Sequence, residues 1–339
     1  LALVTQLRLR VGPVVFHVRI VGSEPAGGRR CTRTCARPLL HDRRYTTPCR
    51  RPWENARMRI VELWRYPIKS LGGERLQTSA VTELGLVGDR SWGIEDVATG
   101  RVLTARREAT LLLAAGRLAE DGSAEVHLGD DVLRSDDELS DWLGRRVRLR
   151  AADHNSGGTF EAPLDDLDES SCNWMQWTGP PGAFHDSKRT RVSLISTTTL
   201  AGQDPRRFRA NVVLDQDGTV GESTESTEDG WVGQSLVIGG VTLDVRRHIG
   251  RCVMVTRPQP GLARDLDVLQ RLNAERAGLA AIGALVTQPG EISVGDTVMP
   301  RVDSTVSRLL RPTVSKTVRR AARQLPKLDR LRRSTSRRA

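Results

Sequence analysis

A single cysteine in the middle of the chain has a neighbour that could make its sulfur reactive. Cys252 follows Arg251 within residues 248–256, and we expect it at the start of a β-strand. A guanidinium beside a thiol favours the thiolate, which acts as a nucleophile or as a ligand to a soft metal. The alternative is a buried core position, because reduced cysteines are among the most buried residue types.

Four segments collect cationic and polar residues at the ends of expected strands: 66–70, 88–92, 206–211 and 250–252. Together they supply a lysine, several arginines, an asparagine and the thiol. A planar guanidinium matches planar anionic groups, and a thiolate matches a soft metal. Each segment alone would be an ordinary solvated surface. The four together favour a site for an anionic ligand with planar hydrogen-bonding edges and a soft metal.

The elements that must position these residues are short strands separated by glycine, aspartate and proline turns. The pattern predicts strands at 60–64, 91–96, 147–151, 192–195, 212–214, 236–238, 241–245, 253–256, 279–286 and 297–299. Gly239 and Gly240 form the turn of a hairpin. Helices are expected only at 136–143, capped by Ser135, and at 265–276. Many strands with a few short helices predict a mainly β fold of two barrel-like domains.

The net charge of +11 comes from the two ends of the chain. Residues 1–57 carry 12 arginines against three acidic residues, and residues 301–339 carry 13 lysines and arginines against two. Between them, residues 58–300 hold 27 basic and 36 acidic side chains, so the middle is mildly acidic. A nucleic-acid function inferred from net charge would rest on the ends alone, and we expect no nucleic-acid partner.

The length of 339 residues suits two modest domains, which we expect at 58–165 and 166–300. Residues 1–57 show neither a signal-peptide pattern nor a strand or helix period. We interpret them as a disordered, non-native extension before a natural start at Met58, with a native disordered extension as the alternative. Residues 301–339 form a basic, partly helical tail, which either lies on an anionic membrane surface or stays solvated.

Cysteine usage and hydropathy limit the remaining classes of protein. Two distant cysteines in the middle, Cys172 and Cys252, make no disulfide framework. Three further cysteines near the N-terminus, together with His41, could supply the ligands of a zinc site, but the residues around them lack the apolar periodicity of a folded module. No segment approaches the roughly 18 apolar residues of a membrane span. We therefore expect a cytoplasmic protein.

Seven short motifs in a fixed order resemble the MOSC family, the domain shared by molybdenum cofactor sulfurases and the mitochondrial amidoxime-reducing component. The motifs lie at 66–70, 88–92, 103–107, 193–196, 207–211, 228–231 and 251–252. The resemblance covers about 58–300. It implies a MOSC N-terminal β-barrel domain followed by a MOSC barrel, and a molybdenum cofactor of the molybdopterin type.

The resemblance also implies roles for individual residues. Cys252 matches the cysteine whose sulfur binds molybdenum, and Asp186 matches an acidic position near the metal, so these two are the expected catalytic residues. The expected cofactor-binding residues are Lys69, Ser70, Arg90, Ser187, Arg209, Asn211, Gly250, Arg251 and Cys252. Candidate proton donors are Asp186, His185 and His248.

The chain departs from the family pattern after the cysteine. The family often reads Asp-Pro-x-x-Gly where this sequence has Arg257-Pro258-Gln259-Pro260-Gly261, which bears on the substrate more than on the cofactor. Pyridoxal phosphate belongs to the family only through a sulfurase domain, and we see no site for it in this sequence. Residues 253–339 contain no cysteine, so a reductase of this kind would take electrons from a separate ferredoxin or flavoprotein.

Three functions remain open from the sequence. The first is a molybdenum-cofactor oxidoreductase that reduces small N-hydroxylated or N-oxide substrates with an external electron donor. The second is a cofactor carrier or sulfur-handling module without turnover, binding molybdopterin or holding a persulfide on Cys252. The third is an interaction protein that uses its basic ends, with Cys252 buried and inert.

Overall fold

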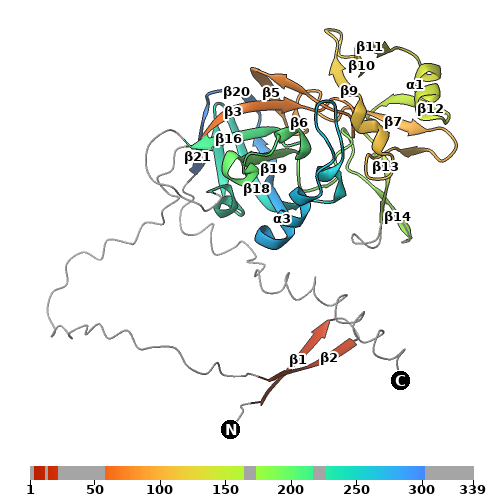
Figure 1. Ribbon diagram of the computed structural model, residues 1–339. Coiled ribbons are helices and arrows are strands. Elements are labelled where there is room, and N and C mark those ends of the chain that lie inside the picture. The colour runs from red at the N-terminus through yellow and green to blue at the C-terminus, as the bar shows by residue number, and fades with distance from the viewer. Residues whose placement is uncertain (1–3, 12–13, 22–57, 164–172, 217–226, 302–339) are drawn as a thin grey trace, which may run out of the picture. The chain divides into compact units, whose positions relative to one another are not determined.

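The structure, a computed structural model, describes residues 4–11, 14–21, 58–163, 173–216 and 227–301 (Figure 1). The chain divides into two compact units, residues 1–49 and residues 50–339. In the first unit, β1 (Val4–Val11) pairs antiparallel with β2 (Val14–Val21). The expectation that residues 1–57 lack a strand pattern is therefore wrong for this hairpin. Apolar residues alternate with arginines from Leu7 to Val11, which is the period of a strand, and the arginine content obscured it.

The second unit contains a closed barrel of seven strands in the order β16-β15-β19-β18-β17-β21-β3, which the β16–β3 pairing closes. Only β15 and β16 run parallel among these neighbours. The barrel strands are β3 (Met58–Arg65), β15 (Val192–Ser196), β16 (Val212–Gln216), β17 (Ser235–Ile238), β18 (Val241–Gly250), β19 (Leu279–Gln288) and β21 (Thr297–Arg301). The predicted mainly β class, with a few short helices, is confirmed.

Smaller sheets surround the barrel. One has the order β11-β10-β9, a second β12-β7-β8, and a third β20-β5-β6, while β13 and β14 form a ribbon and β4 extends the barrel sheet beside β3. Their bounds are β4 (Glu74–Leu76), β5 (Thr78–Thr82), β6 (Gly85–Leu86), β7 (Trp92–Asp96), β8 (Arg101–Val102), β9 (Ala115–Leu118), β10 (Ala124–Leu128), β11 (Asp131–Leu133), β12 (Val147–Ala151), β13 (Thr159–Pro163), β14 (Trp174–Thr178) and β20 (Gly290–Ser293). Figure 1 shows β9–β12 and α1 on one side of this unit and α3 on the other.

The two halves of the sequence share strands. β3 belongs by sequence to the first half, yet it lies between β16 and β21 of the second half. In the same way, β20 of the second half pairs with β5 of the first. Residues 66–73, which follow β3, therefore leave the barrel directly toward the smaller sheets.

The helices largely follow the predictions. α1 (Asp136–Leu143) begins at the predicted residue, with a capping box between Ser135 and Glu138. α3 (Asp267–Arg276) starts two residues later than expected, and α2 (Thr197–Leu200) is a single turn. The 3₁₀ segments are η2 (Ala109–Leu113), η3 (Pro205–Arg207), η4 (Thr227–Trp231) and η5 (Val253–Thr256). No helix of the described residues is both long and apolar enough to cross a bilayer.

The strand predicted at 253–256 is wrong, because these residues form η5. The Thr256 hydroxyl donates to the Val253 carbonyl at 2.8 Å and closes the turn. Three apolar residues and a threonine are too few for periodicity to separate a strand from a turn. The turn lies between two cores: Val255 is buried in the cluster that holds Tyr66 and Phe208, and Met254 packs against the cluster of the N-terminal half. Cys252 is the N-cap of η5.

Candidate functional site

Loops from both halves of the chain meet around the ring of Tyr66, which is buried just after β3. The guanidinium carbon of Arg209 lies 4.4 Å from the ring centroid, and that of Arg90 lies 5.4 Å from it. Burial raises the pKa of Tyr66 to about 12 although these arginines oppose the shift. Tyr66 is therefore a neutral phenol at physiological pH, flanked by two cations.

Lys69 is only 4% exposed and lies over the Phe160 ring, with its ammonium nitrogen 4.2 Å from the centroid. The ammonium donates to the Phe184 carbonyl at 3.0 Å and forms a short ion pair with Asp186. Burial lowers the pKa of Lys69, while the Asp186 carboxylate opposes this shift. Residues 115 and 117 positions later in the chain thus hold the lysine in place.

Arg90 is fixed by a buried carboxylate. Asp89 forms an ion pair with the Arg90 guanidinium and accepts a hydrogen bond from the Tyr66 amide at 2.8 Å. Burial disfavours the Arg90 cation, but the neighbouring Asp89 and Asp186 carboxylates hold its pKa above the ordinary value. The Arg90 amide also donates to the Tyr66 carbonyl at 2.7 Å, so the two loops are joined in both directions.

Arg209 and Arg251 are the least compensated cations of the site. Arg209 donates to the Leu71 carbonyl, and Arg251 donates to the carbonyls of Phe208 at 2.7 Å and Ala280 at 2.9 Å. Burial lowers the pKa of each to about 10. Both remain charged at pH 7, and their contacts with carbonyl dipoles leave most of that charge unneutralised.

Three site residues have backbones in the left-handed region without being glycine: Ser70 (φ 72°), Arg90 (φ 54°) and Arg209 (φ 53°). This conformation is unfavourable for residues with a Cβ, and such residues cluster at ligand and active sites. The Ser70 hydroxyl oxygen accepts from the Ala105 amide at 2.9 Å, which leaves its proton available as a donor. The sequence did not reveal this shared strain.

Cys252 follows strand β18 and Arg251 and begins η5. Its thiol is partly exposed, and the adjacent Arg251 interacts with it electrostatically. Gly250, the residue before Arg251, ends β18 and pairs with Leu279. The Arg251 amide donates to the Gly278 carbonyl at 2.8 Å. The core-packing interpretation of a fully buried thiol therefore does not fit the structure.

The segment after Phe184 divides into an exposed and a buried part. The Asp186 side chain is 77% exposed, and the Lys69 ammonium holds its pKa below the ordinary value. The Ser187 hydroxyl accepts from the Arg189 amide at 3.1 Å. His185 is buried against the Leu84 carbonyl at 2.9 Å, and burial lowers its pKa to about 4. A neutral, buried imidazole is a poor proton donor, so the geometry does not support that role for His185.

Two other expected residues have mainly internal partners. The Asn211 side-chain oxygen accepts from the Ser193 amide and hydroxyl at 3.1 and 2.9 Å, and its nitrogen donates to the Trp64 carbonyl at 3.3 Å. These bonds tie β15 and β16 to β3, which is a structural role. His248 lies on β18, and its Nε2 is 3.4 Å from a carboxylate oxygen of Asp229. This contact gives no support for the expected role of His248 as a proton donor.

Sequence reasoning missed three residues that shape the site: Tyr66, Asp89 and Phe160. Tyr66 lies in segment 66–70 and Asp89 in segment 88–92. The prediction took only the cationic and hydroxyl residues of these segments and passed over the phenol and the carboxylate. Phe160 belongs to β13, and no local sequence pattern indicates its contact with Lys69, because the two residues are 91 positions apart in the sequence.

The cluster of Lys69, Arg90, Arg209 and Arg251 has four cations against two carboxylates, Asp89 and Asp186. It therefore favours an anionic ligand. Within the described residues, the Tyr66 hydroxyl and one terminal nitrogen of Arg251 are buried without a hydrogen-bond partner. Native structures rarely leave such donors unsatisfied unless water or a ligand completes them. These residues fit a phosphorylated, planar ligand held beside Cys252.

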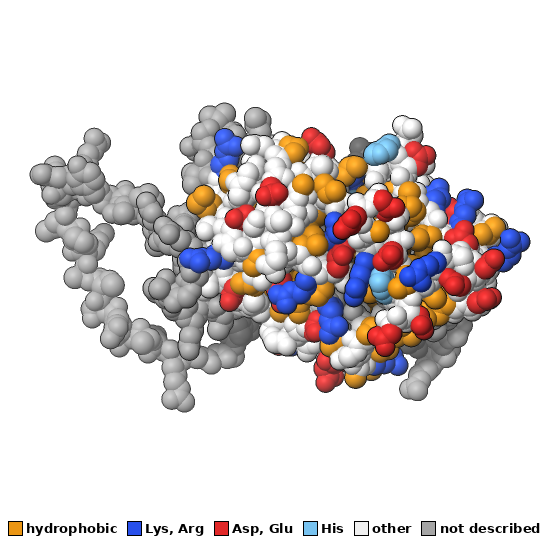
Figure 2. Space-filling view, turned by 90° about the horizontal axis from the view of Figure 1, so that it is seen from above, with side chains coloured by type: hydrophobic (Ala, Val, Ile, Leu, Met, Phe, Trp, Pro, Cys, Tyr) orange, Lys and Arg blue, Asp and Glu red, His pale blue; other side chains and the backbone are white. Residues whose placement is uncertain are grey.

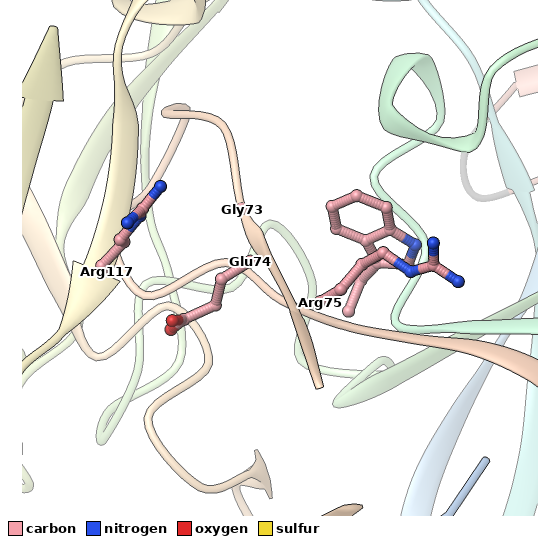
Figure 3. Close-up of a pocket in the computed structure, with 5 residues that line it drawn as sticks. Gly73, Glu74, Arg75 and Arg117 are labelled. Carbon is pink, nitrogen blue, oxygen red and sulfur yellow. The ribbon is translucent and has the colours of Figure 1, made fainter. Parts of the chain in front are cut away.

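Other features of the described surface do not compete with this cluster. A shallow hollow lined by Trp64, Gly73, Glu74, Arg75 and Arg117 contains none of the expected residues, and Glu74 there is paired with Arg65 at 2.9 Å (Figure 3). Acidic and basic side chains are interspersed on the face shown in Figure 2. No three His, Cys, Asp or Glu side chains gather into a metal site in the part of the chain that the structure describes. The three N-terminal cysteines lie outside that part.

Comparison with known families gives two matches. Residues 57–156 match the MOSC N-terminal beta barrel domain, and residues 184–299 match the MOSC domain. The matched ranges contain every expected site residue named above.

Two individual proteins are similar to the chain. It is 25% identical over 272 residues to a molybdenum cofactor sulfurase of Drosophila grimshawi, covering 69% of this chain and 33% of the sulfurase. The chain thus spans about a third of that relative's length. A crystal structure of the YUAD protein from Bacillus subtilis aligns over 71% of this chain and 94% of that one, with 12% identity and a TM-score of 0.32, which is too low to support an argument.

Proposed function

This chain belongs to the family of proteins that carry a MOSC N-terminal β-barrel domain and a MOSC domain, and from this membership we propose that it binds the molybdenum cofactor. The observation that carries the proposal is the convergence of Arg90, Arg209 and Arg251 around Tyr66, with Lys69 close enough to interact with Arg90 and Arg209 and with the Cys252 thiol next to Arg251. The cations suit the phosphate and pterin edge. The thiolate suits a metal that already carries dithiolene sulfurs.

Each half of the site has its own part in this proposal. Lys69, Ser70 and Arg90 would hold the phosphate and pterin edge from the N-terminal side, and Arg209 and Arg251 from the barrel side. Cys252 would bind molybdenum. Asn211 would act indirectly, by holding β15 and β16 against β3.

We propose further that the protein is an oxidoreductase that reduces small N-hydroxylated or N-oxide compounds. The bound cofactor would supply two-electron oxygen-atom transfer. Reduction of an N–OH group to N–H consumes two electrons and two protons and releases water. The electrons would come from a separate ferredoxin or flavoprotein, and the protons from solvent. Asp186, the exposed carboxylate beside the Lys69 ammonium, would hold that ammonium in place. A cytoplasmic location is part of this proposal, because a reduced thiol ligand persists there.

A second candidate function has one observation in its favour, the similarity to a molybdenum cofactor sulfurase. In that case the same cations would bind the cofactor for transfer, or Cys252 would carry a persulfide, without turnover of an N-oxygenated substrate. The partly exposed thiol at the N-cap of η5 is accessible enough for either role.

Metal analysis of the full chain, purified from a host that makes the cofactor, tests cofactor binding. We expect stoichiometric molybdenum in the natural sequence and its loss in Cys252→Ser, with a thermal midpoint close to that of the parent. The exposed Arg264→Ala variant is the matched control and should keep the metal. Metal-free protein in the natural sequence, or full molybdenum in Cys252→Ser, would sink the assignment.

An activity assay separates the two candidate functions. Cofactor-loaded protein should reduce benzamidoxime to benzamidine with a chemically reduced viologen dye as electron donor. Molybdenum without any such turnover would favour the carrier or sulfur-handling function instead.

A further inference from the structure

The 3₁₀ turn η5, which follows Cys252, is held from the barrel side by a buried arginine. Arg207 donates from its two terminal nitrogens to the carbonyls of Val255 at 3.4 Å, Arg257 at 3.3 Å and Ala263 at 2.7 Å. One guanidinium thereby fixes three points of the loop 253–263. None of these contacts reaches the N-terminal half of the chain.

Arg257 makes the contact in the opposite direction. Its terminal nitrogen donates to the Arg106 carbonyl at 2.9 Å, across 151 positions of sequence. Its own amide donates to Met254 at 3.2 Å, so the side chain projects from the end of the same turn that Cys252 begins. Arg257 is thus anchored at one end to η5 and at the other to the N-terminal half.

The carbonyl that Arg257 holds belongs to a tight turn connected to the cofactor side of the site. The amides of Arg107 and Glu108 both donate to the Thr104 carbonyl, at 2.9 and 2.8 Å, and so close this turn. The Ala105 amide donates to the Ser70 hydroxyl oxygen at 2.9 Å. Arg106 is therefore the next residue after the one that Ser70 holds.

The position of Arg257 is energetically costly. Its Nε is buried without a hydrogen-bond partner among the described residues, and a buried donor of this kind costs free energy. An aspartate there would direct a carboxylate, which accepts hydrogen bonds only, toward the Arg106 carbonyl oxygen.

From these contacts we infer that Arg257 is a positioning residue that couples the Cys252 turn to the turn 104–107 and, through it, to Ser70. Its side chain acts through its hydrogen bond to the Arg106 carbonyl. It sets the separation between the thiolate side and the phosphate side of one site, with Arg207 holding the same loop from behind. The inference deepens the proposed function, because it concerns the geometry of the same site, but its contacts exist whether or not that function is correct.

The test combines two readouts on the full chain, neither of which needs a loaded cofactor. The first is the rate at which iodoacetamide alkylates Cys252, followed by mass spectrometry of the peptide that contains it. The second is amide hydrogen exchange of the turn 104–107. In Arg257→Ala we expect both rates to rise by about tenfold or more, since tenfold is the lower end of the range that follows from losing one hydrogen bond made by a charged group.

Three further variants separate positioning from a general loss of fold. Arg257→Lys keeps a cationic donor, so both rates should lie between those of the parent and those of the alanine variant. In Arg257→Asp both rates should be higher than in the alanine variant. Arg264→Ala, at the exposed residue directly after this loop, should match the parent. If the protein carries molybdenum and turns over substrate, Arg257→Ala should lower kcat more than it raises KM, because the metal and the cofactor edge are misaligned.

The outcomes distinguish this inference from the proposed function. Faster alkylation of Cys252 with unchanged exchange at 104–107, in a variant that unfolds cooperatively, would show that Arg257 acts only within its own loop and would overturn the coupling. The same holds if neither rate changes. Absence of molybdenum with both rates raised would refute the proposed function and leave the coupling standing.

Discussion

Lys69 illustrates how the site keeps charge in a place where water cannot stabilise it. Its ammonium is buried between the Phe160 ring and the Phe184 carbonyl, with Asp186 as the carboxylate partner. Arg209 and Arg251 are buried with carbonyl partners instead. Burying a cation this way is unfavourable unless partners compensate it, so the cluster is expected to gain stability when an anion binds.

Substitution of Arg209 should show that planarity matters as well as charge. Arg209→Ala should weaken cofactor retention by about 1.5–3 kcal/mol, the range for hydrogen bonds to charged groups. Arg209→Lys should restore only part, since an ammonium can neither stack on Tyr66 nor make a bidentate contact. Molybdenum per protein after gel filtration at rising salt measures this. Full occupancy in both variants would mean that Arg209 serves the fold alone.

His185 makes the stability of the protein depend on pH. Its pKa is about 4 in the folded protein, against 6.5 for an unperturbed histidine, so the unfolded chain binds a proton first as pH falls. Stability from this residue is complete above pH 6.5 and is lost between pH 6.5 and about 4, by up to about 3 kcal/mol. Urea unfolding of the natural sequence and of His185→Gln across that range measures it. Parallel pH curves for the two proteins would contradict the prediction.

At the scale of elements, periodicity predicted most of the barrel and failed where partners decide the structure. Strand β3 and helix α1 follow from their own residues: a run rich in apolar residues from Met58 to Trp64, and Ser135 with Glu138 as a capping box. η5 does not, because Val253–Thr256 is a short, mostly apolar segment whose turn depends on Arg207 and on the two cores beside it.

The candidate site could be predicted from sequence only in part. Its cations could be predicted because they lie in short motifs at the ends of expected strands. The left-handed backbones of Ser70 and Arg90, and the packing of Phe160 under Lys69, depend on contacts between segments that are distant in sequence. Local patterns carry no information about such contacts.

Strand β3 provides a test at this scale. A protein that begins at Met58 should melt like the full chain and bind cofactor, since residues 1–49 form a separate compact unit. A protein that begins at Tyr66 should lose the barrel, because β3 pairs with both β16 and β21 and buries Met58, Ile60 and Leu63. Circular dichroism melts compare the two. A cooperative transition in the shorter protein would show that the barrel closes without β3.

For the whole molecule, the exchange of strands between the two halves of the sequence means that neither half is complete alone. The barrel takes β3 from the first half, and the β5–β6 sheet takes β20 from the second. The site follows the same division, with Lys69 and Arg90 on one side and Arg209, Arg251 and Cys252 on the other. Folding and assembly of the site should therefore be one cooperative event.

Splitting the chain tests this directly. A fragment of residues 166–301 has barrel strands β16 and β21 with no β3 between them, and such open edges pair with other chains. We expect this fragment to aggregate when produced alone and to become soluble when co-produced with residues 58–165. The co-purified pair should bind molybdenum, because all four cations and Cys252 are then present. As a control, the pair carrying Leu63→Ala, a fully buried β3 residue, should associate more weakly by about 2–5 kcal/mol. A soluble, cooperatively unfolding fragment 166–301 would show that the barrel folds as an independent domain and does not require β3.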